Sequence, residues 1–290
     1  MKKIIFPILA IAGLFFILQS CDKINEPYLE LVRVDTGGGG SGTSKRVLLL
    51  EDFTGHKCVN CPEASLLARN LKLAHDGQVV LISVHAGYFA TPDITGQYTA
   101  DFRTTEGEAF NSYYGILSNP AGLINRSEFS GKKILSPDKW ETIVNEELLK
   151  PVEAGISIES TYNADTRALH LIVSTTFLKD FSEDLLLSVG ITESDIISPQ
   201  KNNNPAVGTT PDILNYSHQH VLRGMVNGSW GQLIKTGGVQ NGEKIEKTFD
   251  YTLPGTWNPE KCSVIAYVMY ADGVNKYKVI QATEAEVSGK

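Results

Sequence analysis

Apolar and polar positions along residues 46–150 form two kinds of pattern. Continuous apolar runs at residues 47–53 and 79–84 are typical of buried strands. The stretch between them, residues 62–75, has apolar residues at helical spacing and predicts a helix. Further elements are expected as helices opening near Thr105 and at Ser136, and as a short strand at residues 121–125. Strands and helices that alternate in this way indicate an α/β domain.

Residues 151–290 have a different pattern, in which apolar and polar residues alternate with period two. The alternation is clear at residues 169–177 and again at 264–270, where Ala271-Asp272-Gly273 signals a hairpin turn. Several such strands with few helices predict an all-β antiparallel sandwich domain. Residues 198–216 lack periodicity and contain three prolines, so we expect a long and functional loop there.

The first 20 residues have the pattern of a signal peptide. Two lysines precede an apolar run of about 15 residues, which is shorter than the roughly 20 residues that cross a bilayer as a helix. Leu18-Gln19-Ser20-Cys21 resembles a lipobox, which implies cleavage before Cys21 and acyl chains such as palmitate on that cysteine. A plain secretory signal or a short membrane anchor is the alternative. Residues 21–45, with their Gly-rich run, are expected to form a flexible tether.

Charge and cysteine content narrow the function. The net charge of −7 argues against a nucleic-acid partner, because such a partner requires a basic face. Export places the cysteines in an oxidising compartment, where the close pair Cys58 and Cys61 can form a disulfide. Cys262 lies in an apolar strand pattern and is expected to be a buried, inert thiol.

The Cys58-Val59-Asn60-Cys61 motif lies between a predicted strand and a predicted helix. Backbone N–H groups at a helix N-terminus stabilise a thiolate, and the basic residues just before the motif add positive charge. We therefore expect Cys58 to be an exposed attacking thiolate and Cys61 a more buried resolving thiol. Alternatively, the helix begins with Asn60 as its cap and Pro62 in its first turn, which changes how the helix dipole meets Cys58.

Other interpretations of the cysteine pair and the histidines stay open. The pair can be a purely structural disulfide, or half of a zinc site that lacks a second ligand pair. His218 and His220 have the spacing of metal ligands on one strand face, but no third ligand is evident. We expect no metal and no cofactor, and we favour a polar cluster at the two histidines.

The order of elements in residues 46–150 resembles that of a thioredoxin-like domain: strand, Cys-x-x-Cys, helix, strand, helix, proline, strand, helix. Residues 114–120, YGILSNP, are similar to the segment that in thioredoxins ends in a cis-proline. The resemblance implies that Pro120 packs beside the disulfide, and that the backbone at Asn119 binds an extended substrate.

The same resemblance assigns a proton-transfer role to an acidic residue. Asp52 precedes Cys58 by six residues, where thioredoxins have a buried acid that moves the proton of the resolving thiol. Glu51 is the alternative inward residue. His85, which follows the second strand, is expected at the same end of the sheet, where it lines the site or forms structural hydrogen bonds. Val59-Asn60 replaces the Gly-Pro of thioredoxins, so the redox direction is left open.

Three segments of the chain resemble the outer-membrane-protein-28-related lipoproteins. They are FTGHKCVNCPE at residues 53–63, VHAGYFA at 84–90 and HQHVLRG at 218–224. The resemblance implies a lipoprotein of the outer membrane, with no settled biochemical role. The lipobox makes lipid on Cys21 the expected anchor, and thiol–disulfide exchange would take envelope proteins or peptides as substrates. The expected fold is an α/β thioredoxin-like domain followed by an all-β antiparallel sandwich domain. Thiol–disulfide exchange is the favoured function, and a surface binding or adhesion lipoprotein with a structural Cys58–Cys61 disulfide is the alternative.

Overall fold

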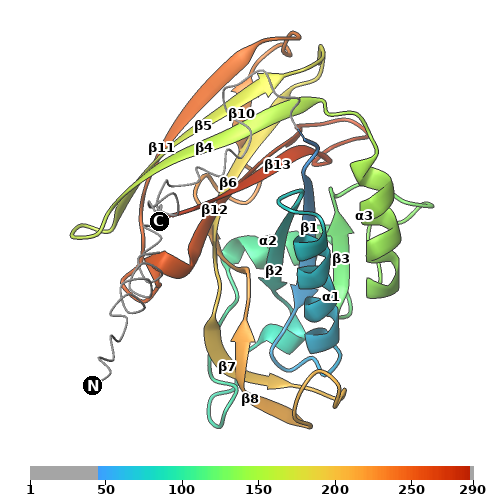
Figure 1. Cartoon of the computed structure of the whole chain (residues 1–290), viewed down its shortest axis with the longest axis vertical. Coiled ribbons are helices and arrows are strands. Elements are labelled where there is room, and N and C mark those ends of the chain that lie inside the picture. The colour runs from blue at the N-terminus through green and yellow to red at the C-terminus, as the bar shows by residue number, and fades with distance from the viewer. Residues whose placement is uncertain (1–44, 288–290) are drawn as a thin grey trace, which may run out of the picture. The chain divides into compact units, whose positions relative to one another are not determined.

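Two β-sheets of very different composition dominate the computed structural model, which describes residues 45–287 (Figure 1). The larger sheet has eight strands, ordered β13 (Val279–Glu286), β12 (Cys262–Tyr270), β6 (Leu185–Glu193), β9 (Val221–Met225), β2 (Val79–His85), β1 (Leu48–Thr54) and β3 (Ala121–Ile124), with β10 (Gln232–Lys235) pairing on β6. The smaller sheet has the order β11 (Lys244–Thr252), β5 (Ala168–Phe177) and β4 (Ala154–Asn163). The predicted signal peptide, Cys21 and the tether up to residue 44 lie outside the described residues.

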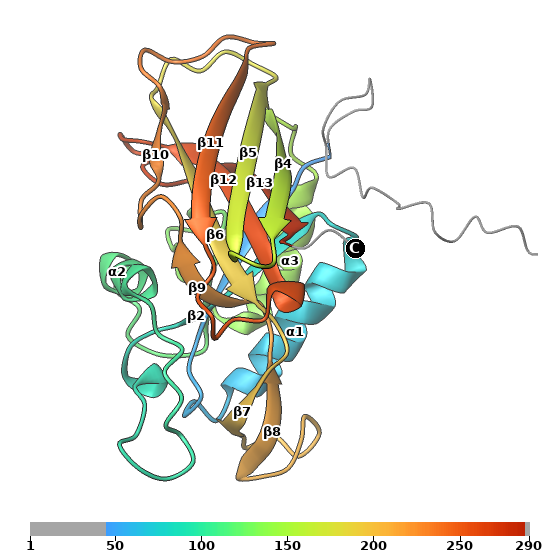
Figure 2. The same ribbon diagram turned by 90° about the vertical axis from the view of Figure 1, so that its left-hand side faces the viewer.

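Strand β1 is buried along its whole length, because helices lie over both of its faces. Leu48 and Leu50 pack with α1 (Cys61–Ala74) and α3 (Trp140–Leu148). Leu49 and Phe53 face the opposite way, toward α2 (Thr105–Tyr114) and β12. Figure 2 shows α2 on one side of β2 and the other two helices on the opposite side. Burial on both faces explains why β1 and β2, which pair in parallel, appear in the sequence as unbroken apolar runs.

The predicted β-rich second part is confirmed, with a difference in how its sheet is used. The three-stranded sheet packs over β6, β12 and β13, and a shared apolar core lies between these layers (Figure 1). The larger sheet does not end there, because β9 pairs in parallel with β2. Strands from before and after residue 150 therefore belong to one mixed sheet, and the boundary between residues 150 and 151 stays a prediction.

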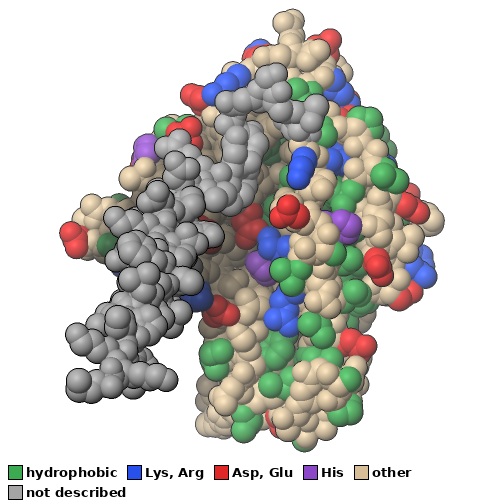
Figure 3. Space-filling view, viewed as in Figure 1, with side chains coloured by type: hydrophobic (Ala, Val, Ile, Leu, Met, Phe, Trp, Pro, Cys, Tyr) green, Lys and Arg blue, Asp and Glu red, His purple; other side chains and the backbone are tan. Residues whose placement is uncertain are grey.

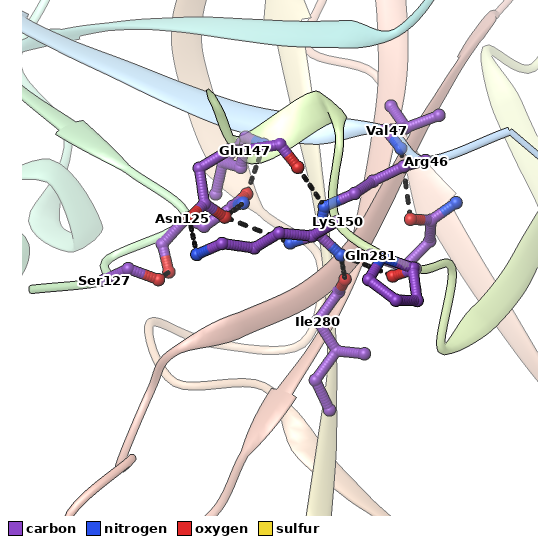
Figure 4. Close-up of polar contacts among 10 residues, drawn as sticks. Arg46, Val47, Asn125, Ser127, Glu147, Lys150, Ile280 and Gln281 are labelled. Atoms are coloured by element: carbon purple, nitrogen blue, oxygen red, sulfur yellow. Dashed lines mark hydrogen bonds and ion pairs between the residues drawn. The ribbon is translucent and has the colours of Figure 1, made fainter. Parts of the chain in front are cut away.

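A buried polar network also joins the two parts of the chain (Figure 4). The Arg46 side chain donates to the backbone and carboxylate oxygens of Glu147 in α3, at 2.7 and 3.1 Å. The same carboxylate accepts from the Asn125 side chain at 3.2 Å, and the Val47 N–H donates to Gln281 of β13 at 3.1 Å. These bonds anchor the start of β1 against α3 and β13.

Two local predictions require correction. Residues 198–216 are not an irregular loop, because they belong to a hairpin whose strands are β7 (Ile196–Lys201) and β8 (Asp212–His218), joined by residues 202–211. Strand β7 could not be predicted from the sequence, because Pro199 interrupts the alternation of apolar and polar residues and lies at a shift in the strand register. Helix α2 is capped by Thr104 rather than Thr105, since the Thr104 hydroxyl accepts from the Gly107 N–H.

No helix among residues 45–287 is long and apolar enough to cross a membrane.

Candidate functional site

Cys58 and Cys61 form a disulfide at the point where β1 passes into α1. Asn60 is the N-cap of α1, with Pro62 in the first turn, so the alternative start of this helix is the correct one. Cys61 therefore lies in the first helical turn, and Cys58 lies just before the cap. Because the sulfurs are bonded to each other, both lie at the positive end of the helix dipole.

The expected exposure of Cys58 is wrong. Cys58 is 2% exposed and Cys61 is 1% exposed, whereas Val59 and Asn60 between them face the solvent. The hairpin of β7 and β8 causes part of this burial. Its Gln200 side chain donates from Nε2 to the carbonyl oxygens of Gly55 and Cys58, at 3.3 and 2.9 Å.

A second segment holds residues 55–60, which are called the cysteine loop below, from the other direction. The Lys57 N–H donates to the Phe89 carbonyl at 3.1 Å, and the Lys57 ammonium pairs with Asp93 at 2.8 Å. Gly55 lies so close to this segment that a Cβ at its position would come within 2.4 Å of the Phe89 carbonyl carbon. Only glycine permits this approach.

Asp52 lies under the cysteine loop, on the face of β1 that α1 covers. One carboxylate oxygen accepts from the Ser65 hydroxyl of α1 at 2.8 Å. The other oxygen, Oδ1, has no hydrogen-bond partner among the described residues. Burial raises the pKa of Asp52 to about 7, although the Ser65 hydrogen bond opposes this shift. Asp52 therefore exchanges a proton near neutral pH.

Glu51, the alternative inward acid, is also fully buried, on the opposite face of β1. Its carboxylate forms a two-fold ion pair with Arg126, at 2.8 and 2.6 Å. Burial by itself lowers the pKa of Arg126, but the nearby Glu51 carboxylate raises it well above the usual value. Both carboxylate oxygens of Glu51 therefore have a partner.

Pro120 and Asn119 are placed at the same end of the sheet as the disulfide. The Asn119–Pro120 peptide bond is cis, and the next residue, Ala121, pairs with Phe53 near the end of β1. His85 lies at this end as well, because it pairs with Thr54 across the parallel strands. The functional roles assigned to these residues stay predictions.

Histidines and aromatic rings fill the space between the cysteine loop and the hairpin. His85 and His218 have ring centroids 5.3 Å apart, and Phe102 packs on both at 5.1 and 4.8 Å. His56, which lies in the cysteine loop, stacks on Tyr98 with ring centroids 5.6 Å apart. These five residues are called the histidine–aromatic cluster below.

The histidines of this cluster are neutral at neutral pH. Burial lowers the pKa of His218 to about 3, with a smaller effect from His56. Burial, followed by the charge of His218, lowers the pKa of His85 well below its usual value. The pKa of His56 is lowered by burial and then by Lys57. Neutral rings of this kind pack together without charge repulsion.

His218 and His220 do not share a site. His218 ends β8 inside the cluster, whereas His220 follows the strand and lies 3.8 Å from Glu284 of β13. Among residues 45–287, no three His, Cys, Asp or Glu side chains are placed to hold a metal ion. His218 packs beside His85 and Phe102, and the favoured polar cluster at the two histidines stays a prediction.

A small polar cavity lies beside Ser65, the residue that donates a hydrogen bond to Asp52. It measures about 10 Å³, which is roughly the space of one water molecule. Its walls include Ser65 of α1, His85 of β2, and Gln200, Tyr216 and His218 of the hairpin. The hairpin residues were missed from the sequence, where the Asn-rich turn after Lys201 was the available sign of a hairpin.

The fold and this site define a β-rich protein with a buried disulfide at one end of a mixed sheet. A family model described as outer membrane protein Omp28 matches residues 107–289, which is more than half of the chain. The chain belongs to the Omp28 family. Its place is accordingly the outer membrane.

Solved structures that align with this chain include proteins from two bacteria. HBP35 of Porphyromonas gingivalis aligns with a TM-score of 0.62 and 18% identity, covering 84% of this chain and 76% of that protein. A protein from Agrobacterium tumefaciens aligns with a TM-score of 0.53 and 13% identity, covering 85% and 97%. A domain of the outer membrane lipoprotein Omp28 from Porphyromonas gingivalis gives 0.30 and 18%, covering 48% and 91%. No curated protein sequence matches the chain.

Proposed function

We propose that this outer-membrane lipoprotein carries out thiol–disulfide exchange, with residues 46–150 as a thioredoxin-like module. The observation that carries the proposal is Asp52, a buried carboxyl with a pKa near 7 beneath the helix that bears Cys61. Groups with strongly shifted pKa values gather at functional sites.

The arrangement of elements supports the thioredoxin-like module. The Cys pair joins β1 to α1, and β2 then runs parallel to β1. After α2 and Pro120, strand β3 pairs antiparallel to β1, and α3 follows. This is the order that the resemblance implied from the sequence.

The cost of burying Asp52 favours a chemical role over a structural one. A shift from 3.8 to about 7 costs about 4 kcal/mol of stability above neutral pH, as an upper bound. A purely structural disulfide does not require a buried carboxyl of this kind. Thiol–disulfide exchange requires a group that accepts the proton of the resolving thiol, and such a carboxyl can do so.

The chemistry begins with the oxidised pair. A substrate thiolate attacks the Cys58 sulfur and forms a mixed disulfide, while the Cys58–Cys61 bond breaks. Cys61 leaves with the electron pair and takes a proton from protonated Asp52. A second substrate thiolate then releases Cys58, so the substrate is oxidised to a disulfide and the cysteine pair is reduced. In the reverse direction the pair reduces a substrate disulfide, and Asp52 accepts the proton from Cys61.

Insulin reduction in the presence of dithiothreitol tests the proposal. Wild type is expected to accelerate the reaction, and Cys58→Ser and Cys61→Ser are expected to abolish the acceleration. Cys262→Ser is a matched control, because Cys262 is buried and unpaired in β12. Wild type that is no faster than a protein-free blank would refute catalysis.

The burial of both sulfurs favours a second candidate, a binding lipoprotein in which the disulfide is structural. The reduction potential separates the two functions. Structural disulfides lie below about −300 mV, whereas disulfides that take part in exchange lie higher.

A further inference from the structure

The hairpin of β7 and β8 is a separate two-stranded sheet that lies against the cysteine loop. Neither strand pairs with the eight-stranded sheet. In Figures 1 and 2 the hairpin lies beyond the ends of β1 and β2, next to the N-terminal end of α1. Because it is a separate sheet, it can move without breaking the ladder of the larger one.

The contact consists of hydrogen bonds to the backbone of the cysteine loop. Besides the two bonds from Gln200, the Lys201 N–H donates to the His56 carbonyl at 2.9 Å. The Asn203 N–H donates to the Val59 carbonyl at 3.2 Å. Carbonyl oxygens on both sides of Cys58 thus accept from three residues of the hairpin, Gln200, Lys201 and Asn203.

These four bonds are accepted by backbone carbonyls, and one side-chain bond, from Asn203 Nδ2 to Asn60 Oδ1 at 2.7 Å, accompanies them. Peptide-binding sites that use main-chain hydrogen bonds accept an extended segment and leave specificity to a few side chains. The hairpin is also nearly uncharged. Its two charged side chains, Lys201 and Asp212, pair with each other at 3.7 Å. Figure 3 shows few charged side chains at the lower end of the face, where Figure 1 draws the hairpin.

We infer that residues 200–203 occupy a docking strip for an extended, uncharged peptide, and that a thiol-bearing peptide reaches the Cys58–Cys61 disulfide only when the hairpin is displaced. The strip consists of the carbonyl groups of Gly55, His56, Cys58 and Val59. The inference names the substrate class of the proposed exchange and rests on that function. In the closed state, the hairpin occupies the position that the substrate peptide would take.

The histidine–aromatic cluster holds the hairpin in its closed position. His218 at the end of β8 contacts His85 and Phe102, and the Tyr98 hydroxyl donates to Asp212 on the same strand. The Lys201 ammonium lies 5.0 Å from the centre of the Tyr98 ring. Removal of Gln200 alone therefore loosens the contact at the disulfide and keeps the base of the hairpin in place.

The test measures access to the disulfide in the full-length oxidised protein. Two probes are used: tris(2-carboxyethyl)phosphine, and an uncharged eight-residue peptide with one cysteine and blocked ends. Reduction and mixed-disulfide formation are followed by acid quench and mass spectrometry. Gln200→Ala is expected to raise both rates about tenfold, because it removes hydrogen bonds that favour the closed state. Gln232→Ala, at an exposed position on β10, is the matched control and is expected to match wild type.

Each outcome decides a part of the inference. Equal rates in wild type and Gln200→Ala would overturn it, as would acceleration that only parallels a fall in the thermal unfolding midpoint. If the phosphine reacts faster but the peptide does not, the hairpin covers the disulfide but the proposed docking strip for a peptide is refuted. If Gln200→Ala reacts faster with the probes but no variant reduces insulin, the proposed exchange function is refuted and the gating by the hairpin is supported. If the protein reduces insulin but the probe rates are equal, the exchange function is supported and the gating is refuted.

Discussion

Glu51 and Asp52 are consecutive residues of β1, and both side chains are completely buried on opposite faces of the strand. Glu51 forms a two-fold ion pair with Arg126, which also donates to the Tyr267 hydroxyl at 3.1 Å. Within residues 45–287, Asp52 has a single side-chain hydrogen bond, from Ser65. One carboxylate is thus fully paired, and the other retains an oxygen that meets no partner in this part of the chain.

The difference separates a fully paired carboxylate from one that titrates near neutral pH. The Glu51–Arg126 pair lies between β1 and β12, where its charges neutralise each other and join strands that are distant in the sequence. Asp52 faces α1 and the cysteine loop, where desolvation keeps its proton bound up to neutral pH. The same burial therefore yields a permanent charge pair on one face and a titratable group on the other.

The largest expected effect comes from breaking the paired face. Arg126→Met leaves Glu51 buried without its partner and is expected to lower the free energy of unfolding by about 3–5 kcal/mol. Arg103→Met is the control, because Arg103 pairs with Asp101 at the surface, and it is expected to cost less than about 1 kcal/mol. Urea unfolding measures both variants. Similar losses in the two would contradict the assignment of Glu51–Arg126 as the structural pair.

On the face of β1 that α1 covers, the substitution Asp52→Asn is expected to stabilise the protein at high pH. The folded-state pKa is raised, so the folded protein binds an extra proton between about pH 4 and pH 7, and stability falls as pH rises through this range. Asparagine removes this loss. The gain is expected to reach at most about 4 kcal/mol at pH 8 and to vanish near pH 4.

Urea unfolding of wild type and Asp52→Asn at matched pH values measures this gain. Comparison at each pH cancels the contribution of the histidines, whose lowered pKa values make the folded state less stable as pH falls. A gain of equal size at pH 4 and pH 8 would show that the carboxyl of Asp52 is not the cause.

The smallest effect is expected from Ser65→Ala, which removes the hydroxyl that Asp52 accepts from. Because this hydrogen bond lowers the pKa of Asp52, its loss is expected to raise that pKa further. The cost in stability is expected to be about 1 kcal/mol. Carboxyl-carbon NMR titration of wild type and the variant measures the direction, and a lower pKa in Ser65→Ala would refute the contact.

Much of the fold was predictable because it depends on local patterns. The apolar runs of β1 and β2, the helical spacing of α1 and the alternation of β5 each reflect the burial of neighbouring positions. The cysteine motif at the strand-to-helix junction was predictable for the same reason. The β7–β8 hairpin was missed, since Pro199 breaks its alternation.

The sequence by itself determined the order of strands and helices, the position of the cysteine pair, and the presence of two adjacent acids on one strand. The tertiary structure decided which acid is paired, and it placed the hairpin over the disulfide. Gln200 and Cys58 are 142 residues apart in the chain. Hydrogen bonds over such distances depend on how whole sheets pack, and the spacing of residues within a single element does not encode them.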